Sequence, residues 1–251
     1  MIKRTLTPAK VLSLLTQLEA SPENYLTLYL RPDSPSDYLA KLTELPSVKE
    51  ISVKEIREAF KEGEFLEEAQ RYGTGLVAFW GEGENRYLLL PPFPITEERV
   101  LHGRPETSLL RHLLEQEHLL GLILVTWGSY TIGLFEGKRL VDYKTGTGYI
   151  HKRTRKGGRS EKRFARRTEE QKKDFLRRVA NRIDERFAGI EPEQIFFGGN
   201  RLILKPLLEE SRYLKSRAER ISKRFINARY ADRQALTAGL RQIELSLLIS
   251  Y

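Results

Sequence analysis

The sequence contains no cysteine and little histidine, and both absences restrict its chemistry. Without cysteine, its 251 residues form no disulfide, no thiolate metal site and no cysteine nucleophile. The four histidines are too scattered for a histidine-rich site, so we expect no metal and no cofactor. The longest apolar run covers only residues 119–127, whereas a membrane span needs about 20 residues. With no signal-peptide core at the N-terminus either, we expect a soluble cytoplasmic protein.

The net charge of +9 comes from a single segment. Residues 151–178 contain 13 Lys and Arg against 4 Asp and Glu, so they carry the whole excess and the rest of the chain is neutral. A local excess of positive charge is typical of a site for a polyanion. A uniformly basic protein would indicate only solubility.

The hydrophobic pattern predicts two α/β domains, residues 1–115 and 116–251. In the first domain, strand patterns alternate with helical ones. The second domain begins with a meander of three strands, at 119–126, 129–135 and 139–143. A basic loop at 151–160 and a long helix from about Ser160 to Phe187 follow. A strand at 194–197, another at 220–226 and a closing helix complete a mixed sheet with helices on its faces.

Several residues of this second domain are expected to be structural. The glycines of Gly198-Gly199-Asn200 are interpreted as a tight strand exit, with anion binding as the alternative. Trp127 is expected in the core. One apolar stripe of the long helix is predicted to face the core: Phe164, Leu176, Val179, Ala180, Ile183 and Phe187.

The basic loop and the helix after it form the candidate binding site. Gly157 and Gly158 stand between a strand and a helix, and repulsion among the neighbouring cations predicts an exposed loop that phosphates would order. The helix adds cations that would contact phosphates. The expected RNA-binding residues are His151, Lys152, Arg153, Arg155, Lys156, Lys162, Arg163, Arg166, Arg167, Lys172 and Lys173.

The segment Gly157-Gly158-Arg159-Ser160, followed by RFARR at 163–167, resembles the GGQ segment of archaeal and eukaryotic class I release factors. It is most similar to the bacterial and archaeal relatives of that superfamily, including Vms-type homologues. The resemblance covers about 118–251 and implies an RNase H-like fold, as in the central domain of release factors. It also implies that the partners are the large ribosomal subunit and tRNA. The catalytic residues that it implies are Gly157, Gly158, Arg159, Ser160 and Glu161.

The family's activity implies release or rescue on the ribosome by hydrolysis of the peptidyl-tRNA ester, or cleavage near the tRNA end in the Vms branch. This ester needs a positioned water and oxyanion stabilisation more than a strong base. The sequence departs from the motif, because Arg159 occupies the release-factor Gln position and Glu161 the Vms-type one. Three interpretations stay open. The backbone acts with Arg159 or Glu161 orienting water, the protein binds without cleaving as in the Gln-less Pelota branch, or the loop acts on another RNA.

A metal-dependent RNA nuclease is a further alternative, because an RNase H-like fold supports that chemistry. It requires clustered carboxylates on neighbouring strands. The strands offer Glu136 and Asp142 alone, so ordinary surface acids are the favoured interpretation.

Overall fold

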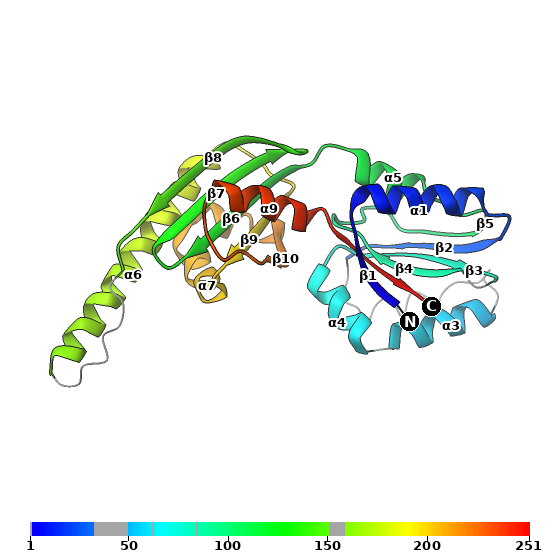
Figure 1. Ribbon diagram of the computed structural model, residues 1–251, viewed down its shortest axis with the longest axis horizontal. Helices are drawn as coiled ribbons and strands as arrows, with labels where there is room; N and C mark the ends of the chain where they lie inside the picture. The colour runs from blue at the N-terminus through cyan, green and yellow to red at the C-terminus, as the bar shows by residue number, and fades with distance from the viewer. Residues whose placement is uncertain (1, 33–49, 62, 84, 151–158) are drawn as a thin grey trace. The chain divides into compact units, whose positions relative to one another are not determined.

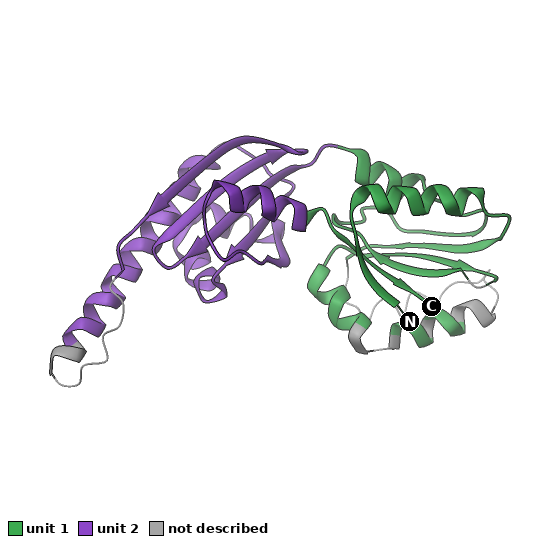
Figure 2. Ribbon diagram, viewed as in Figure 1, with its two compact units in different colours: residues 1–116, 243–251 green, residues 117–242 purple. Residues whose placement is uncertain are grey.

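The computed structural model describes residues 2–32, 50–61, 63–83, 85–150 and 159–251. The chain forms two compact units, one of residues 1–116 and 243–251 and the other of residues 117–242 (Figure 2). Within the described residues, no helix has both the length and the apolar character needed to cross a membrane.

The first unit is built on a six-stranded sheet in which all neighbouring strands are antiparallel. In spatial order its strands are β1 (Ile2–Leu6), β11 (Ser246–Ser250), β4 (Arg86–Leu90), β3 (Leu76–Gly81), β2 (Tyr25–Leu30) and β5 (Arg99–Gly103). The C-terminal strand β11 lies between β1 and β4, and Ile2 pairs with Ser250. The two ends of the chain are therefore held together in one sheet.

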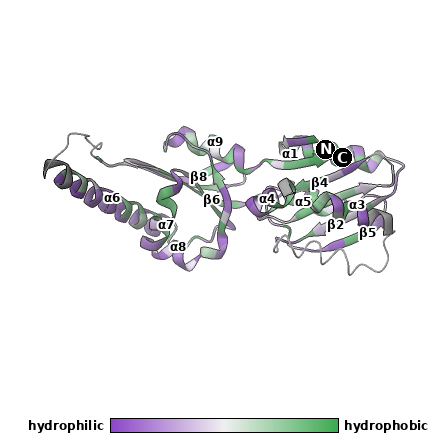
Figure 3. Cartoon of the chain, turned by 90° about the horizontal axis from the view of Figure 1, so that it is seen from below, coloured by the Kyte–Doolittle hydropathy of each residue, from purple (hydrophilic) through white to green (hydrophobic). Residues whose placement is uncertain are grey.

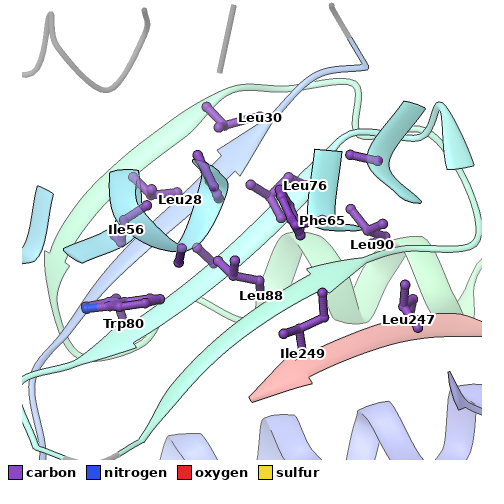
Figure 4. Packing of buried hydrophobic residues seen from close by; sticks show 14 of the residues in the cluster. Leu28, Leu30, Ile56, Phe65, Leu76, Trp80, Leu88, Leu90, Leu247 and Ile249 are labelled. Carbon is purple, nitrogen blue, oxygen red and sulfur yellow. The ribbon is translucent and has the colours of Figure 1, made fainter. Parts of the chain in front are cut away.

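Helices cover both faces of this sheet (Figure 1). On one face lie α1 (Pro8–Ala20) and α5 (Ser108–Glu115), and on the other lie α3 (Glu50–Lys61) and α4 (Gly63–Tyr72). The side chains between the sheet and α3 and α4 form a hydrophobic core, in which Ile56 and Phe65 pack against strand residues such as Leu28 and Leu88 (Figure 4). Trp80 is buried at its edge, and its Nε1 donates a hydrogen bond to Glu55 at 3.0 Å.

The second unit is built on a five-stranded mixed sheet. Its spatial order is β10 (Ile221–Ile226), β9 (Gln194–Gly199), β6 (Leu119–Thr126), β7 (Ser129–Glu136) and β8 (Arg139–Thr147). The meander of β6, β7 and β8 is antiparallel, whereas β9 and β10 run parallel to β6. The predicted fold class, a mixed α/β chain whose second part is built on a mixed sheet, is confirmed.

Four helices cover the two faces of this second sheet. One face carries α6 (Arg159–Arg186), α7 (Arg201–Glu210) and α8 (Arg212–Ser216), whose apolar side chains share one buried cluster with the strands. The other face carries α9 (Arg233–Ile243), where Leu236 packs directly over Gly133. A Cβ at Gly133 would come within 2.9 Å of the Leu236 side chain, so the glycine allows this close packing.

The strand exit at Gly198-Gly199-Asn200 is tight, as expected. Gly199 has φ +94°, and a Cβ there would lie 2.3 Å from the carbonyl oxygen of Val125. The Asn200 side chain accepts a hydrogen bond from the backbone N–H of Leu202 and so caps α7. These glycines serve packing and turn geometry, and the anion-binding alternative gains no support.

Replacing Gly199 by alanine is expected to lower the free energy of unfolding by about 2–4 kcal/mol, because backbone strain and a clash with Val125 add together. Gly189→Ala is the matched control, since Gly189 has φ +73° but no atom within 4 Å of an added Cβ. The control should lose about 1–2 kcal/mol from strain alone. Urea unfolding measures both changes, and equal losses would show that the contact with Val125 costs nothing.

Candidate nucleic-acid interface

The N-terminal part of α6 extends beyond the sheet of the second unit (Figure 1). Among the side chains described from Arg163 onward, the first buried one is Phe175, which lies against the rings of Trp127 and Tyr130 at centroid distances of 6.4 and 6.1 Å. At a rise of about 1.5 Å per residue, residue 159 lies about 24 Å along the axis from residue 175. We call residues 159–174 the arm.

The arm holds its helical form without a hydrophobic core. Most of its described side chains are exposed and hydrophilic (Figure 3). Ion pairs link successive turns: Arg166 to Glu170 at 3.1 Å and Lys172 to Glu169 at 2.8 Å. Such pairs at helical spacing add a few tenths of a kcal/mol each, about 0.2–0.5. The arm is thus a helix that can enter a polar cavity without exposing a large apolar surface.

One prediction for this helix was wrong. Phe164 does not face the core: its side chain is 40% exposed, with the guanidinium of Arg163 5.9 Å from its ring centroid. The other members of the predicted stripe, from Leu176 to Phe187, are buried. Phe164 keeps the periodicity of the stripe, but it lies on the arm, where the sheet no longer reaches the helix.

Two glycines at the end of β8 allow close packing, Gly146 against β7 and Gly148 against the base of the arm. A Cβ at Gly146 would lie 2.4 Å from the Tyr130 hydroxyl, and one at Gly148 would lie 2.7 Å from Nη2 of Arg178. The Gly148 N–H also donates to the Gly128 carbonyl at 2.8 Å. Gly146 therefore lets β8 pack closely on Tyr130 of β7, and Gly148 lets the chain after β8 approach α6 at the base of the arm.

The predicted site residues divide into three groups. Gly157 and Gly158 lie outside the described residues, as do His151, Lys152, Arg153, Arg155 and Lys156. The second group lies in the first turn of α6, where the backbone is described but the side chains are not: Arg159, Ser160, Glu161 and Lys162. The third group is described in full and lies along the arm: Arg163, Arg166, Arg167, Lys172 and Lys173.

Four of the five described cations on the arm are exposed: Arg163, Arg166, Arg167 and Lys173. The Arg166 side chain is 85% exposed, so its pairing with Glu170 leaves it open to a phosphate. Lys172 differs, because its Nζ lies 5.1 Å from the Trp127 ring centroid as well as 2.8 Å from Glu169. Lys172 therefore helps to fasten the arm to the unit. Trp127 itself is partly buried against the core cluster.

Beyond the arm, several charged side chains pair with each other within the unit. Arg182 donates a hydrogen bond to Glu185 at 2.5 Å, and this bond raises the pKa of the Arg182 guanidinium. Asp142 pairs with Arg186 at 3.2 Å, and Glu136 pairs with Arg139. In the part of the chain that the structure describes, no group of three His, Asp or Glu residues could hold a metal ion. The two carboxylates considered for a nuclease thus act as partners of arginines.

Sequence reasoning missed a shallow pocket at the base of the arm, with a volume of about 350 Å³. Its lining residues are Tyr149, Gln171, Asp174, Arg177 and Arg178. Two signals in the sequence pointed to this pocket. They are the aromatic residue after Gly146-Thr147-Gly148 and the arginine pair one helical turn beyond Asp174. Only the fold shows that they meet.

Comparison with known proteins identifies the chain as a relative of the class I release-factor superfamily. The chain belongs to the Actinobacteria/chloroflexi VLRF1 release factor family, whose model matches residues 118–246, just over half of the chain. The match begins at the start of the second unit's sheet and includes the arm and its loop.

Curated relatives extend the similarity to archaeal proteins. Peptide chain release factor subunit 1 of Aeropyrum pernix is 26% identical over 257 aligned positions, which cover 94% of this chain and 68% of the relative. Its counterpart from Saccharolobus solfataricus is 26% identical over 180 positions, covering 64% of this chain and 48% of the relative. The crystal structure of the archaeal translation termination factor aRF1 aligns with 20% identity and a TM-score of 0.39, covering 95% of this chain and 70% of that one.

Proposed function

We propose that this protein is a ribosome-associated release or rescue factor that acts on the ester of peptidyl-tRNA. The observation that carries the proposal is the arm: a helix that reaches about 24 Å beyond its core anchor and begins at Arg159, directly after Gly157 and Gly158 in the sequence. Membership of a release factor family supports the same function.

The chemistry of ester release suits a catalytic segment carried at the end of the arm. The ester is intrinsically labile, so a catalyst needs mainly to place water and to stabilise the developing oxyanion. Backbone N–H groups of Gly157 and Gly158 supply donors without bulk, and a loop at the tip of a thin helix can reach a reaction centre inside a large RNA particle. Exposed cations behind the loop bind phosphates of tRNA or of the large-subunit RNA.

The loop differs from the release-factor pattern where water is oriented, because Arg159 and Glu161 stand at the two positions where relatives of this superfamily carry Gln. In the hydrolytic mechanism that we propose, the backbone provides the oxyanion donors, and Arg159 or Glu161 orients the water. The same difference favours a second candidate function, in which the protein binds stalled complexes and leaves the ester intact.

Release of a labelled peptide from stalled ribosomal complexes tests the first function. Gly158→Ala is expected to slow release about tenfold or more, because a Cβ at the loop displaces the donors from the ester. Gly189→Ala, at a surface turn of the same unit, is the control and should release at the wild-type rate.

Sedimentation of the protein with the same complexes separates the two candidates. Association with ribosomes together with an intact ester would refute hydrolysis and establish the binding function. Absence of both association and release would refute the proposal as a whole.

A further inference from the structure

The pocket at the base of the arm combines an exposed aromatic ring with two guanidinium groups. Tyr149 is 74% exposed, and Arg177 and Arg178 come from the facing helix α6. We propose that this pocket binds one unpaired RNA nucleotide, with its base stacked on Tyr149 and its phosphate held by Arg178. The inference rests on the proposed function for the source of the RNA, but the pocket residues differ from the proposed catalytic segment 157–161.

Tyr149 offers an exposed ring for stacking, and the backbone on both sides of it is anchored. The residue before it, Gly148, is hydrogen bonded to Gly128 at 2.8 Å and packed against Phe175. The residue after it, Ile150, packs on the core cluster. The backbone thus holds the tyrosine next to α6, and every base has a face that can stack on its exposed ring.

Arg178 is placed to bind a phosphate. Its Nη2 lies against the backbone at Gly148, close to the position that a Cβ would occupy. Within the described residues Arg178 makes no ion pair, whereas its neighbour Arg177 is paired with Asp174 at 2.7 Å. A guanidinium that is oriented by packing but lacks a carboxylate partner favours an anionic ligand.

The other pocket residues can contact the edge of a base. The Asp174 carboxylate accepts hydrogen bonds, and the Gln171 amide both donates and accepts them. These are the groups that recognise the exocyclic amino and ring nitrogen atoms of an unpaired base. In a duplex these atoms are already paired and the base cannot lie flat on the tyrosine, so the pocket discriminates in favour of single-stranded RNA.

One face of α6 joins this pocket to the tip of the arm. One continuous helical stripe is formed by residues at successive intervals of four, four, three and four: Arg163, Arg167, Gln171, Asp174 and Arg178. The stripe is about 22 Å long, from the rise of a helix. A strand of RNA with one base in the pocket can therefore place its next phosphates near Arg167 and Arg163.

Fluorescence anisotropy with a labelled single-stranded RNA hexamer, and with a blunt duplex of the same sequence, tests this site. Tyr149→Ala is expected to weaken binding of the hexamer about 5- to 150-fold, the loss typical of one stacked base. Tyr149→Phe keeps the ring and should bind like the wild type. The duplex should bind Tyr149→Ala and wild type equally. Unchanged hexamer affinity, or equal weakening for hexamer and duplex, would overturn the proposal.

Salt titrations separate stacking from charge. For the hexamer, Tyr149→Ala should leave the slope of log affinity against log salt unchanged, whereas Arg178→Gln should reduce it by about 0.7, the value for one phosphate on a single strand. An unchanged slope for Arg178→Gln would refute the phosphate contact. Thermal melting of both variants verifies that they are folded.

Two further measurements identify the ligand. Cross-linking with 5-iodouridine RNA should attach the base to Tyr149, as mapped by mass spectrometry, and attachment elsewhere would contradict the assignment. A free nucleoside monophosphate that bound as tightly as the hexamer would replace RNA as the ligand. Since all these assays use the isolated protein, they can fail while peptide release succeeds, and the reverse is also possible.

Discussion

Deletion of residues 167–170 is expected to slow peptide release at least about a hundredfold, because misplacement of a catalytic group by even 1 Å can cost that much. The deletion removes slightly more than one turn of α6 and shortens the arm by about 6 Å. It removes Arg167, Thr168, Glu169 and Glu170, one base and two acids, so the arm does not become less positive. The loss of release would therefore follow from reach and not from charge. Single-turnover release from stalled complexes provides the measurement.

Replacing the same four residues by alanine is the matched control. It removes the same side chains but keeps the length of the arm, and alanine is the strongest helix former. We expect this variant to release within a few-fold of wild type. Both variants should melt like wild type, since residues 167–170 precede the first buried side chain of the helix, Phe175. Equal release by deletion and control would show that the length of the arm has no role.

The elements with strong local patterns were predicted well from the sequence. The meander appeared at 119–126, 129–135 and 139–143, and the structure has β6, β7 and β8 there. The long helix, expected from about Ser160 to Phe187, spans Arg159–Arg186. In each case neighbouring residues determine the element: alternation for half-buried strands and a 3.6-residue period for the helix.

The elements that depend on distant partners could not be predicted. The strand β1 is short and almost wholly exposed, and its five residues carry two cations, so nothing local marks it as a strand. It exists because β11 pairs with it from the other end of the chain. The residues of β11 give the first sheet its sixth strand, and no periodicity within 1–115 indicates that it is missing.

The candidate site was predicted in its composition but not in its geometry. The basic segment could be located from the sequence, because the local net charge depends only on which residues are present there. Counting could not separate Lys172, which lies over Trp127, from Lys173, which is exposed. It also could not bring Tyr149 next to Arg178, since that approach depends on the close packing of Gly148 against α6.

Neutralising the exposed cations of the arm is expected to weaken binding to ribosomal complexes and to tRNA at least about a hundredfold at moderate salt, if each contacts one phosphate. The variant combines Arg163→Gln, Arg166→Gln, Arg167→Gln and Lys173→Gln. Each lost contact should reduce the slope of log affinity against log salt by about 0.7–0.9, so the total reduction should be about 3 to 4. Lys172 is left in place because it helps to fasten the arm.

A control with the same change in net charge shows whether location matters. Four exposed lysines of the second unit lie outside the arm: Lys138, Lys205, Lys215 and Lys223. Changing these to glutamine lowers the net charge of the protein by the same amount. It should leave the RNA affinity and its salt dependence largely unchanged, because in salt solution exposed charges interact over only about 10 Å. Equal weakening in the two variants would mean that RNA responds to the total charge of the protein. A larger loss in the arm variant would locate the phosphates on α6, along the path from the pocket to the start of the helix at Arg159.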